Sequence, residues 1–167
     1  WTLIVTANSP SARYDHAMTY DSVRGKVVMF GGYANDTWEY DGVDWNQIGT
    51  VSSPSARSEH AMAYDSGRGK IVMFGGYDGN WTNDTWEYDG VNWSQITTSN
   101  PPVTRFAHSM VYDAARGKIV MFGGYNGNSS NTDVLDDTWE YDGLDWAQVP
   151  NASGPSPVGR TNHGAAY

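Results

Sequence analysis

One ten-residue phrase recurs three times with almost no change, and this repetition limits what the chain can fold into. It reads RGKVVMFGGY at 24–33 and RGKIVMFGGY at both 68–77 and 116–125. Comparable segments begin with a tryptophan, at Trp1, Trp45, Trp93 and Trp146. The repeats are therefore 44, 48 and 53 residues long. A period of this size predicts that each repeat forms one supersecondary unit that packs against its neighbours.

Each repeat has the residue pattern of four strands joined by turns. In the second repeat, the strand expected over 57–64 ends in a turn closed by glycine. The run 70–74 is continuously apolar, as in a strand covered on both faces, and we expect the Gly-Gly pair after it to end that strand. Aromatic and polar residues then alternate over 85–88, an Asp-Gly hairpin signal follows, and a fourth strand begins at Trp93. Four-stranded antiparallel sheets at this period indicate the blades of a β-propeller.

Three recurring positions in each repeat carry a resemblance to a known family. A glycine pair ends the apolar strand, at Gly31-Gly32, Gly75-Gly76 and Gly123-Gly124. A tyrosine follows in the next strand, at Tyr40, Tyr88 and Tyr141, and a tryptophan lies five residues beyond it, at Trp45, Trp93 and Trp146. This pattern resembles the Kelch motif, and the phrases HAMAYDSGRGKIVMFGG and DTWEYDG resemble bacterial Kelch-like repeat proteins. The resemblance covers essentially the whole chain and implies an all-β propeller, with the first strand of each blade innermost and the fourth outermost.

The repeat boundaries predict three complete blades and two unaccompanied strands. Residues 1–12 match 45–56, an outer strand and its link, while 160–167 match 105–112, an inner strand. We expect the outer strand of a preceding blade and its link over 1–12, and three blades over 13–50, 51–100 and 101–150. A link and the inner strand of a following blade are expected over 151–167. Propellers typically close with four or more blades. The chain is therefore expected to be a segment of a longer propeller, which we favour, or to be completed by partner chains.

Composition and charge exclude several classes of partner. The net charge of −9 makes nucleic acid and anionic membrane surfaces poor partners. No run of 18 apolar residues predicts a membrane span. The chain has no cysteine, which rules out disulfides, thiolate metal sites and cysteine nucleophiles. We expect an extracellular or cell-surface location, and the composition leaves the cytoplasm open.

Length variation among the repeats is confined to one loop. From the second glycine of each pair to the tryptophan of the D-T-W-E-Y phrase the spacing is 6, then 10, then 15 residues, which accounts for the whole change in repeat length. This loop joins the second and third strands, and in an antiparallel blade it emerges on the same side as the links between blades. Variable loops on a rigid scaffold are the usual place for recognition, so we expect a ligand to bind on this side.

Aromatic residues on the variable side are the first candidates for ligand binding. Trp81 lies in the loop YDGNWTND, which the first repeat lacks. It is expected to be either a lid on the scaffold or a stacking platform for a sugar or peptide. The tyrosines that follow the glycine pairs begin the same side and are candidates to flank such a site, at Tyr33, Tyr77 and Tyr125.

Arginine and histidine recur at the start of every inner strand. The arginines are the residues most suited to an anionic ligand at the channel mouth, although we favour ion pairs with the repeated acids, and they are Arg13, Arg57, Arg105 and Arg160. A histidine follows three residues later, at His16, His60, His108 and His163. Recurrence with the repeat favours packing near the axis, with a hydrogen bond to a neighbouring blade, over a metal site.

Oxygen-rich loops and glycosylation motifs complete the candidate sites. We expect no cofactor, with calcium as a possible exception. Neither loop has the full EF-hand pattern, and the two possible calcium ligand sets are Asp78, Asn80 and Asp84, or Asn128, Asp133 and Asp136. Sequons for N-glycosylation, several of them part of the repeated phrase, occur at Asn35, Asn80, Asn83, Asn92, Asn128 and Asn151.

The function favoured by the sequence is noncatalytic binding. A galactose-oxidase-like copper site would use a cysteine-crosslinked tyrosine, which a chain without cysteine cannot supply. No nucleophile elbow, phosphate loop or metalloprotease motif is present. We therefore expect a scaffold that recognises a protein or carbohydrate through the loops between strands two and three. Two alternatives remain: a surface or filament subunit that self-associates through its open strands, and a fragment of a larger Kelch-propeller enzyme.

Overall fold

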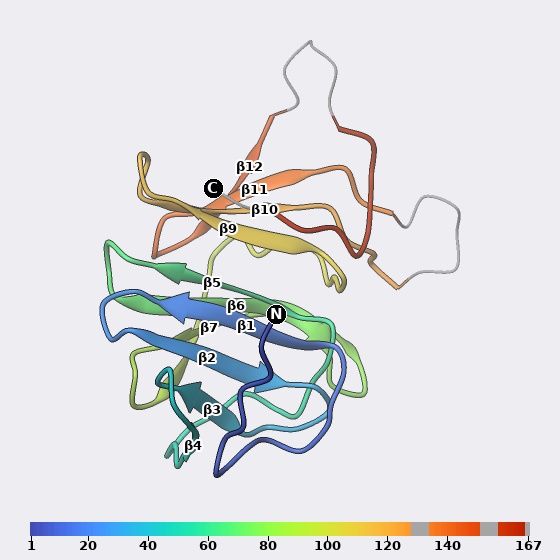
Figure 1. The fold of residues 1–167 in the computed structure, drawn as a ribbon. Coiled ribbons are helices and arrows are strands. Elements are labelled where there is room, and N and C mark those ends of the chain that lie inside the picture. The colour runs from blue at the N-terminus through green and yellow to red at the C-terminus, as the bar shows by residue number, and fades with distance from the viewer. Residues whose placement is uncertain (128–133, 151–156, 166–167) are drawn as a thin grey trace.

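The computed structural model describes residues 1–127, 134–150 and 157–165, which form three antiparallel sheets of four strands each (Figure 1). The first sheet contains β1 (His16–Asp21), β2 (Lys26–Gly31), β3 (Thr37–Tyr40) and β4 (Trp45–Ile48). The second contains β5 (Ala61–Asp65), β6 (Lys70–Tyr77), β7 (Trp81–Tyr88) and β8 (Trp93–Ile96). The third contains β9 (Ser109–Asp113), β10 (Lys118–Phe122), β11 (Thr138–Tyr141) and β12 (Trp146–Val149). In each sheet the strands lie in chain order, as predicted for a propeller blade.

The described residues contain no helix, so none of them forms a segment that could cross a membrane as a helix. Among the first strands of the three blades, β5 contacts both β1 and β9, while the fourth strands lie at the far edge of each sheet (Figure 1). The predicted order of strands, from innermost to outermost, is confirmed. We call the end at which β1 begins and β2 ends the loop-rich end, because it carries the variable loops and the links between blades.

Repeated turn residues explain why the strands reverse where they do. Asp21 at the end of β1 accepts hydrogen bonds from the backbone N–H groups of Val23 and Arg24, at 3.1 and 3.0 Å. Gly25 then adopts φ +67°, a conformation that disfavours residues with a Cβ atom. Equivalent aspartates close the same turn in the other blades, at Asp65 and Asp113. These fixed turns form the end of the molecule opposite the variable loops.

The second blade differs from the expectation that a glycine pair ends the second strand. That prediction holds in blades one and three, where β2 and β10 stop at Gly31 and Phe122, but it is wrong in blade two. There β6 continues through the glycine pair to Tyr77, with a register shift between Phe74 and Gly76. The tight turn after Tyr77, where the Asp78 N–H donates to the Asn80 carbonyl at 3.1 Å, allows β7 to pair with this extension.

The first strands also begin later than predicted. The expected strand over 57–64 is replaced by β5, which starts at Ala61, and only isolated bridges pair Arg57 with Ala34 and Ser58 with Tyr77. Glu59 has φ +57°, which interrupts the extended backbone just before the strand.

Blades are joined by a repeated set of apolar and polar contacts. In the interface between blades one and two, Trp93 is buried against Val28 and Phe30 of blade one. Its indole Nε1 donates to the Thr37 Oγ1 at 2.9 Å, and Trp146 donates likewise to Thr85 in the next interface. Since a buried indole N–H needs an acceptor, the threonine of the D-T-W-E-Y phrase has a structural role.

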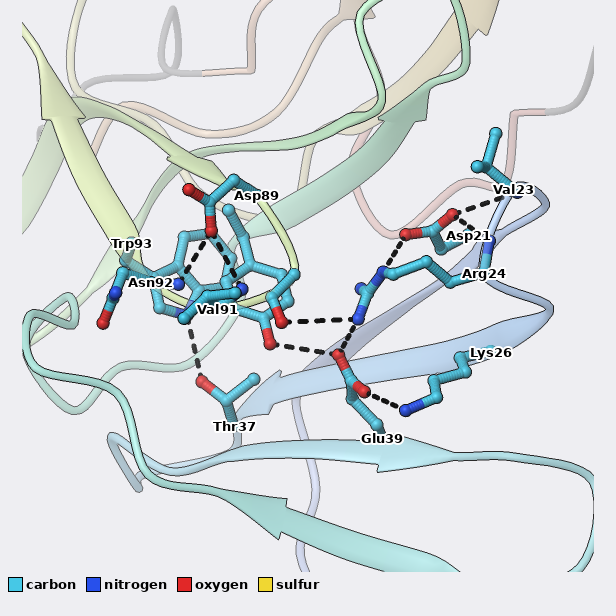
Figure 2. Close-up of polar contacts among 12 residues, drawn as sticks. Asp21, Val23, Arg24, Lys26, Thr37, Glu39, Asp89, Val91, Asn92 and Trp93 are labelled. Carbon is cyan, nitrogen blue, oxygen red and sulfur yellow. Dashed lines mark hydrogen bonds and ion pairs between the residues drawn. The ribbon is translucent and has the colours of Figure 1, made fainter.

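Figure 2 shows the charged part of the same interface, centred on Glu39. Its carboxylate accepts hydrogen bonds from Arg24 and from Lys26, the latter at 2.8 Å, and from the Tyr88 hydroxyl of blade two at 3.0 Å. Arg24 also pairs with Asp21 at 2.6 Å. Blade two repeats the arrangement, since Glu87 accepts from Arg68 and from the Tyr141 hydroxyl. The charged residues of the repeated phrases therefore hold blade to blade.

Candidate functional site

The repeated arginines are held in buried ion pairs. The Arg57 guanidinium binds both carboxylate oxygens of Asp84, at 2.7 and 2.8 Å, and the Gly75 carbonyl at 3.0 Å. Burial would raise the pKa of Asp84, but the hydrogen bonds and charge of Arg57 outweigh it and hold that pKa below its usual value. The Trp86 indole also donates to Asp84. This bidentate geometry leaves Arg57 only 1% exposed.

The other blades repeat this ion pair, the role that the sequence favoured for the arginines. Arg105 pairs with Asp137 at 2.7 and 2.8 Å, and Arg13 pairs with Asp36 at 2.6 and 3.0 Å. Because Arg57 and Arg105 are fully buried, neither presents an exposed guanidinium to an anionic ligand, which was the less favoured of the two roles expected from the sequence. Arg160 is exposed, and its Nε donates to the Val158 carbonyl at 3.1 Å.

Trp81 belongs to an aromatic cluster at the junction of blades two and three. Its ring stacks on Phe106, with ring centres 4.0 Å apart and planes 13° apart. Tyr77 lies 4.5 Å from Trp81, and Tyr125 lies 5.2 Å from Phe106. A Cβ atom added at Gly127 would fall 2.3 Å from the indole Nε1, so the loop of blade three lies directly against Trp81. We call Tyr77, Trp81, Phe106 and Tyr125 the aromatic cluster.

Within the cluster, Trp81 is a packing residue between blades two and three more than an exposed stacking surface. Phe106 covers one face of its ring and Gly127 lies against its edge, so the side chain is only 36% exposed. The candidate Tyr33 lies elsewhere, in an aromatic pair with Tyr14, their ring centres 5.1 Å apart. Tyr14 and Tyr33 are 67% and 53% exposed, so the pair presents the more open aromatic surface at the loop-rich end.

Sequence reasoning missed Tyr14 and Phe106, which occupy the same position in the repeat. Between the constant arginine and the constant histidine two residues vary, and the first of them is Tyr14, Ser58, Phe106 and Thr161 in successive repeats. That variation between two constant residues was the available signal. It places an aromatic ring beside the tyrosine that follows the glycine pair in blades one and three.

A hollow of about 210 Å³ lies between the blades where the inner strands begin. The residue before each repeated histidine has a positive φ of 53–57°, and these residues are Asp15, Glu59, Ala107 and Asn162. Backbone hydrogen bonds connect each of these residues to the one in the preceding repeat. The Glu59 N–H donates to the Asp15 carbonyl at 2.9 Å, the Ala107 N–H to the Glu59 carbonyl at 3.0 Å, and the Asn162 N–H to the Ala107 carbonyl at 2.9 Å. The hollow is lined by these four residues together with His16, His60 and His108. We call it the axial hollow.

The repeated histidines pack between blades. The rings of His60, His108 and His163 each meet a phenylalanine ring of the preceding blade edge to face, with ring centres 5.7–5.8 Å apart, and these partners are Phe30, Phe74 and Phe122 respectively. The predicted hydrogen bond to a neighbouring blade is present for His163, whose Nε2 lies 2.6 Å from the Ser109 hydroxyl. Burial, reinforced by the neighbouring arginines, lowers the pKa of His60 and of His108 to about 3, so both rings are neutral at physiological pH.

The two predicted calcium sets lie in different surroundings. Asp84 of the first set is committed to Arg57, while Asp78 accepts hydrogen bonds from the Ser55 hydroxyl at 2.7 Å and from the Asn80 N–H at 3.2 Å. In the described ranges no three His, Asp or Glu side chains converge in a metal-binding group. Of the second set, Asn128 and Asp133 lie outside the described residues, and Asp136 is exposed. Calcium binding by either set stays a prediction.

The glycosylation motifs occupy different environments. Asn35 and Asn80 are exposed. The Asn83 amide donates to the Pro102 carbonyl at 3.2 Å, and the Asn92 side chain accepts from the Val51 N–H at 2.7 Å, so both are engaged in structural contacts. Asn128 and Asn151 lie outside the described residues.

Three chain-ordered four-stranded blades, joined through a repeated interface around their inner strands, define a β-propeller architecture. The model of the KLHDC2/KLHL20/DRC7 Kelch-repeats domain matches residues 1–167, so the chain belongs to the Kelch-repeat family. A comparison with curated proteins found no match. Kelch-repeat domains generally bind proteins, and membership indicates a protein-interaction or scaffold module.

Proposed function

We propose that the chain is a noncatalytic binding module that holds a segment of a partner protein against its loop-rich end. The observation that carries this proposal is the exposed aromatic pair, Tyr14 and Tyr33, on a scaffold whose blades are tightly joined. Tyrosine contributes contact area at low entropic cost and adds a hydroxyl for hydrogen bonding, which suits protein recognition.

A protein segment fits this end better than a sugar ring. Sugar stacking needs a flat aromatic face, but Phe106 covers one face of Trp81, and the Tyr14 and Tyr33 rings are tilted by 56°. The tilted pair forms an angular surface that a side chain can fill. Carbohydrate remains the second ligand class of the sequence-based proposal, and it would have to use the exposed part of Trp81.

The noncatalytic part of the proposal rests on how the polar residues are used. The repeated arginines, aspartates and glutamates near the variable loops and the interfaces are committed to structural ion pairs, such as Arg57–Asp84 and Arg24–Glu39. No cofactor is needed for the proposed binding, and an extracellular or cell-surface location is part of the proposal.

Site-directed photocrosslinking tests where a partner binds. A benzophenone side chain would replace Tyr33 at the loop-rich end or, as the matched control, Gln47 on the exposed outer strand β4. After illumination in an extract of the source cells, we expect a discrete adduct from position 33 that position 47 does not give. Adducts from position 47 alone, or from neither position, would contradict binding at the loop-rich end.

Self-association is a second candidate function, favoured by the faces of blades one and three that no other described blade covers. Glu39 and Thr37 are each 1% exposed beneath blade two, whereas the equivalent Glu140 and Thr138 of blade three are only partly buried. At the other end, Tyr40 and Trp45 are partly buried where Tyr88 and Trp93 are covered. Light scattering over a range of concentrations tests this candidate, since a constant monomer mass would exclude it.

A further inference from the structure

The axial hollow is lined by residues that vary inside the most constant part of the repeat. The phrase reads RYDH, RSEH, RFAH and RTNH in successive repeats, so the arginine and histidine stay fixed while the residue before histidine changes chemistry. A purely structural role would not require the residue before the histidine to vary. The variable residues are brought together at the centre of the loop-rich end, where the backbone hydrogen bonds between neighbouring blades hold them in place.

The hollow carries negative charge that its surroundings leave uncompensated. Asp15 and Glu59 both line it, and neither has a salt bridge to any described residue. The nearby arginines Arg13 and Arg57 are committed to Asp36 and Asp84. Burial together with the charge of Asp15 raises the pKa of Glu59, as expected for two carboxylates that share a small space.

A buried histidine in the same hollow is an independent sign of a ligand. His108 is 7% exposed, and neither of its ring nitrogens has a hydrogen-bond partner among the described residues. A buried polar group without a partner is costly in a folded protein, which makes such groups markers of binding sites. Because the ring is neutral, one of its buried nitrogens is an acceptor that no described residue uses.

We propose that the axial hollow binds one organic cation, the ammonium or guanidinium group of a lysine or arginine side chain on the partner protein, between Asp15 and Glu59. This inference rests on the proposed function, because the hollow opens at the loop-rich end where the partner segment would lie. Both cationic groups carry only hydrogen-bond donors, and the hollow offers two carboxylates and a neutral imidazole as acceptors. Its volume of about 210 Å³ is several times the roughly 30 Å³ of one water molecule, enough for the head group and adjacent methylenes.

The aromatic pair next to the hollow supports the same ligand chemistry. Tyr14 does not line the hollow, but it directly precedes the lining residue Asp15 in the chain and is largely exposed. Cations are attracted to the faces of aromatic rings. A metal ion is less suitable, because the hollow does not bring three His, Asp or Glu side chains of the described residues into a metal-binding group.

NMR titration of the whole chain with short blocked peptides tests the proposal. The probes are acetyl-Gly-Ser-X-Ser-Gly-amide peptides with X as arginine, lysine, glutamine or glutamate. We expect the arginine or lysine peptide to shift the backbone amide signals of residues 15, 59, 107 and 162, and the glutamine and glutamate peptides to leave them unchanged. Equal shifts with the glutamine peptide, or the same shifts with calcium chloride alone, would overturn the proposal.

Charge-neutralising variants make the test specific. The double variant Asp15→Asn and Glu59→Gln keeps the side-chain shapes and should weaken binding of the cationic peptide at least tenfold. Asp136→Asn removes one negative charge, as Glu59→Gln alone does, from an exposed loop position and should leave binding unchanged. Thermal unfolding of each variant checks folding, and Glu59→Gln alone serves if the double variant unfolds. Unaltered affinity in the double variant would overturn the site.

Failure of this inference can be told apart from failure of the proposed function. If the crosslink at position 33 forms but no cationic peptide binds, the loop-rich end recognises a partner without the axial hollow. If the cationic peptide binds but no crosslink forms, the hollow is a cation site that the proposed partner does not use.

Discussion

The hydroxyl that links each blade to its neighbour gives a quantitative test of the interface. Tyr88→Phe removes the donor to Glu39, a bond of 2.9–3.0 Å in both interfaces, while the ring remains packed on Trp93. A buried hydrogen bond to a charged group contributes about 1.5–3 kcal/mol. Since Glu39 keeps Arg24 and Lys26 as partners, we expect the loss to fall within that range and not above it.

The chain supplies its own matched control in blade one. Tyr40 occupies the equivalent position and packs on Trp45 at 5.3 Å, but its buried hydroxyl has no hydrogen-bond partner in the described part of the chain. Tyr40→Phe therefore deletes the same atom without deleting a bond, and should change the free energy of unfolding by no more than about 0.5 kcal/mol.

Urea and thermal unfolding of both variants would measure the difference. For a chain of this size, the expected loss in Tyr88→Phe corresponds to a fall in Tm of roughly 3–12 °C. The Tyr40→Phe protein should unfold at the temperature of the unmodified chain. Equal destabilisation by the two substitutions would refute the reasoning. It would show that the cost comes from removing the hydroxyl group and not from losing the hydrogen bond between blades.

Two further predictions concern the loop-rich end. Gly127→Ala should displace the Trp81 ring, because the new Cβ would lie 2.3 Å from its Nε1, and the indole fluorescence should change. The control Gly42→Ala is also at positive φ but has open space around it. It should leave the fluorescence unchanged and lower the free energy of unfolding by only about 1–2 kcal/mol. Asp84→Asn should destabilise the chain at neutral pH, since the pKa of Asp84 lies below its usual 3.8 when paired with Arg57. That stabilisation is complete above about pH 3.8 and is lost as the pH falls through the lower folded-state pKa, so the difference between the two proteins should shrink in acid; a difference that grew in acid would contradict the ion-pair account.

The sequence predicted most of the fold because the repeat specifies its own turns. Asp21 and its equivalents place the tight turns, and the tryptophans that begin the outer strands place the blade boundaries. The extension of β6 and β7 was not predictable from the glycine pair, since the pair is identical in all three repeats. What differs is the loop that follows, and its turn decides whether the strands continue to pair.

The candidate site was predicted less well, because it depends on contacts between repeats. Trp81 and Tyr77 were identified from their loop, but stacking of Trp81 on Phe106 joins residues of different blades. The axial hollow likewise forms only when Asp15 and Glu59 are brought together by the packing of β1 against β5. Patterns within one repeat cannot show which residues of neighbouring repeats will meet.

The most direct test of the account is hydrogen–deuterium exchange of the chain with and without the partner recovered by crosslinking at position 33. We predict slower exchange at the loop-rich end, in the segments 13–16, 32–35 and 103–107, with no change in the opposite turns at 22–25, 66–69 and 114–117. Protection confined to those opposite turns or to the outer strands β4, β8 and β12 would contradict recognition through the loop-rich end.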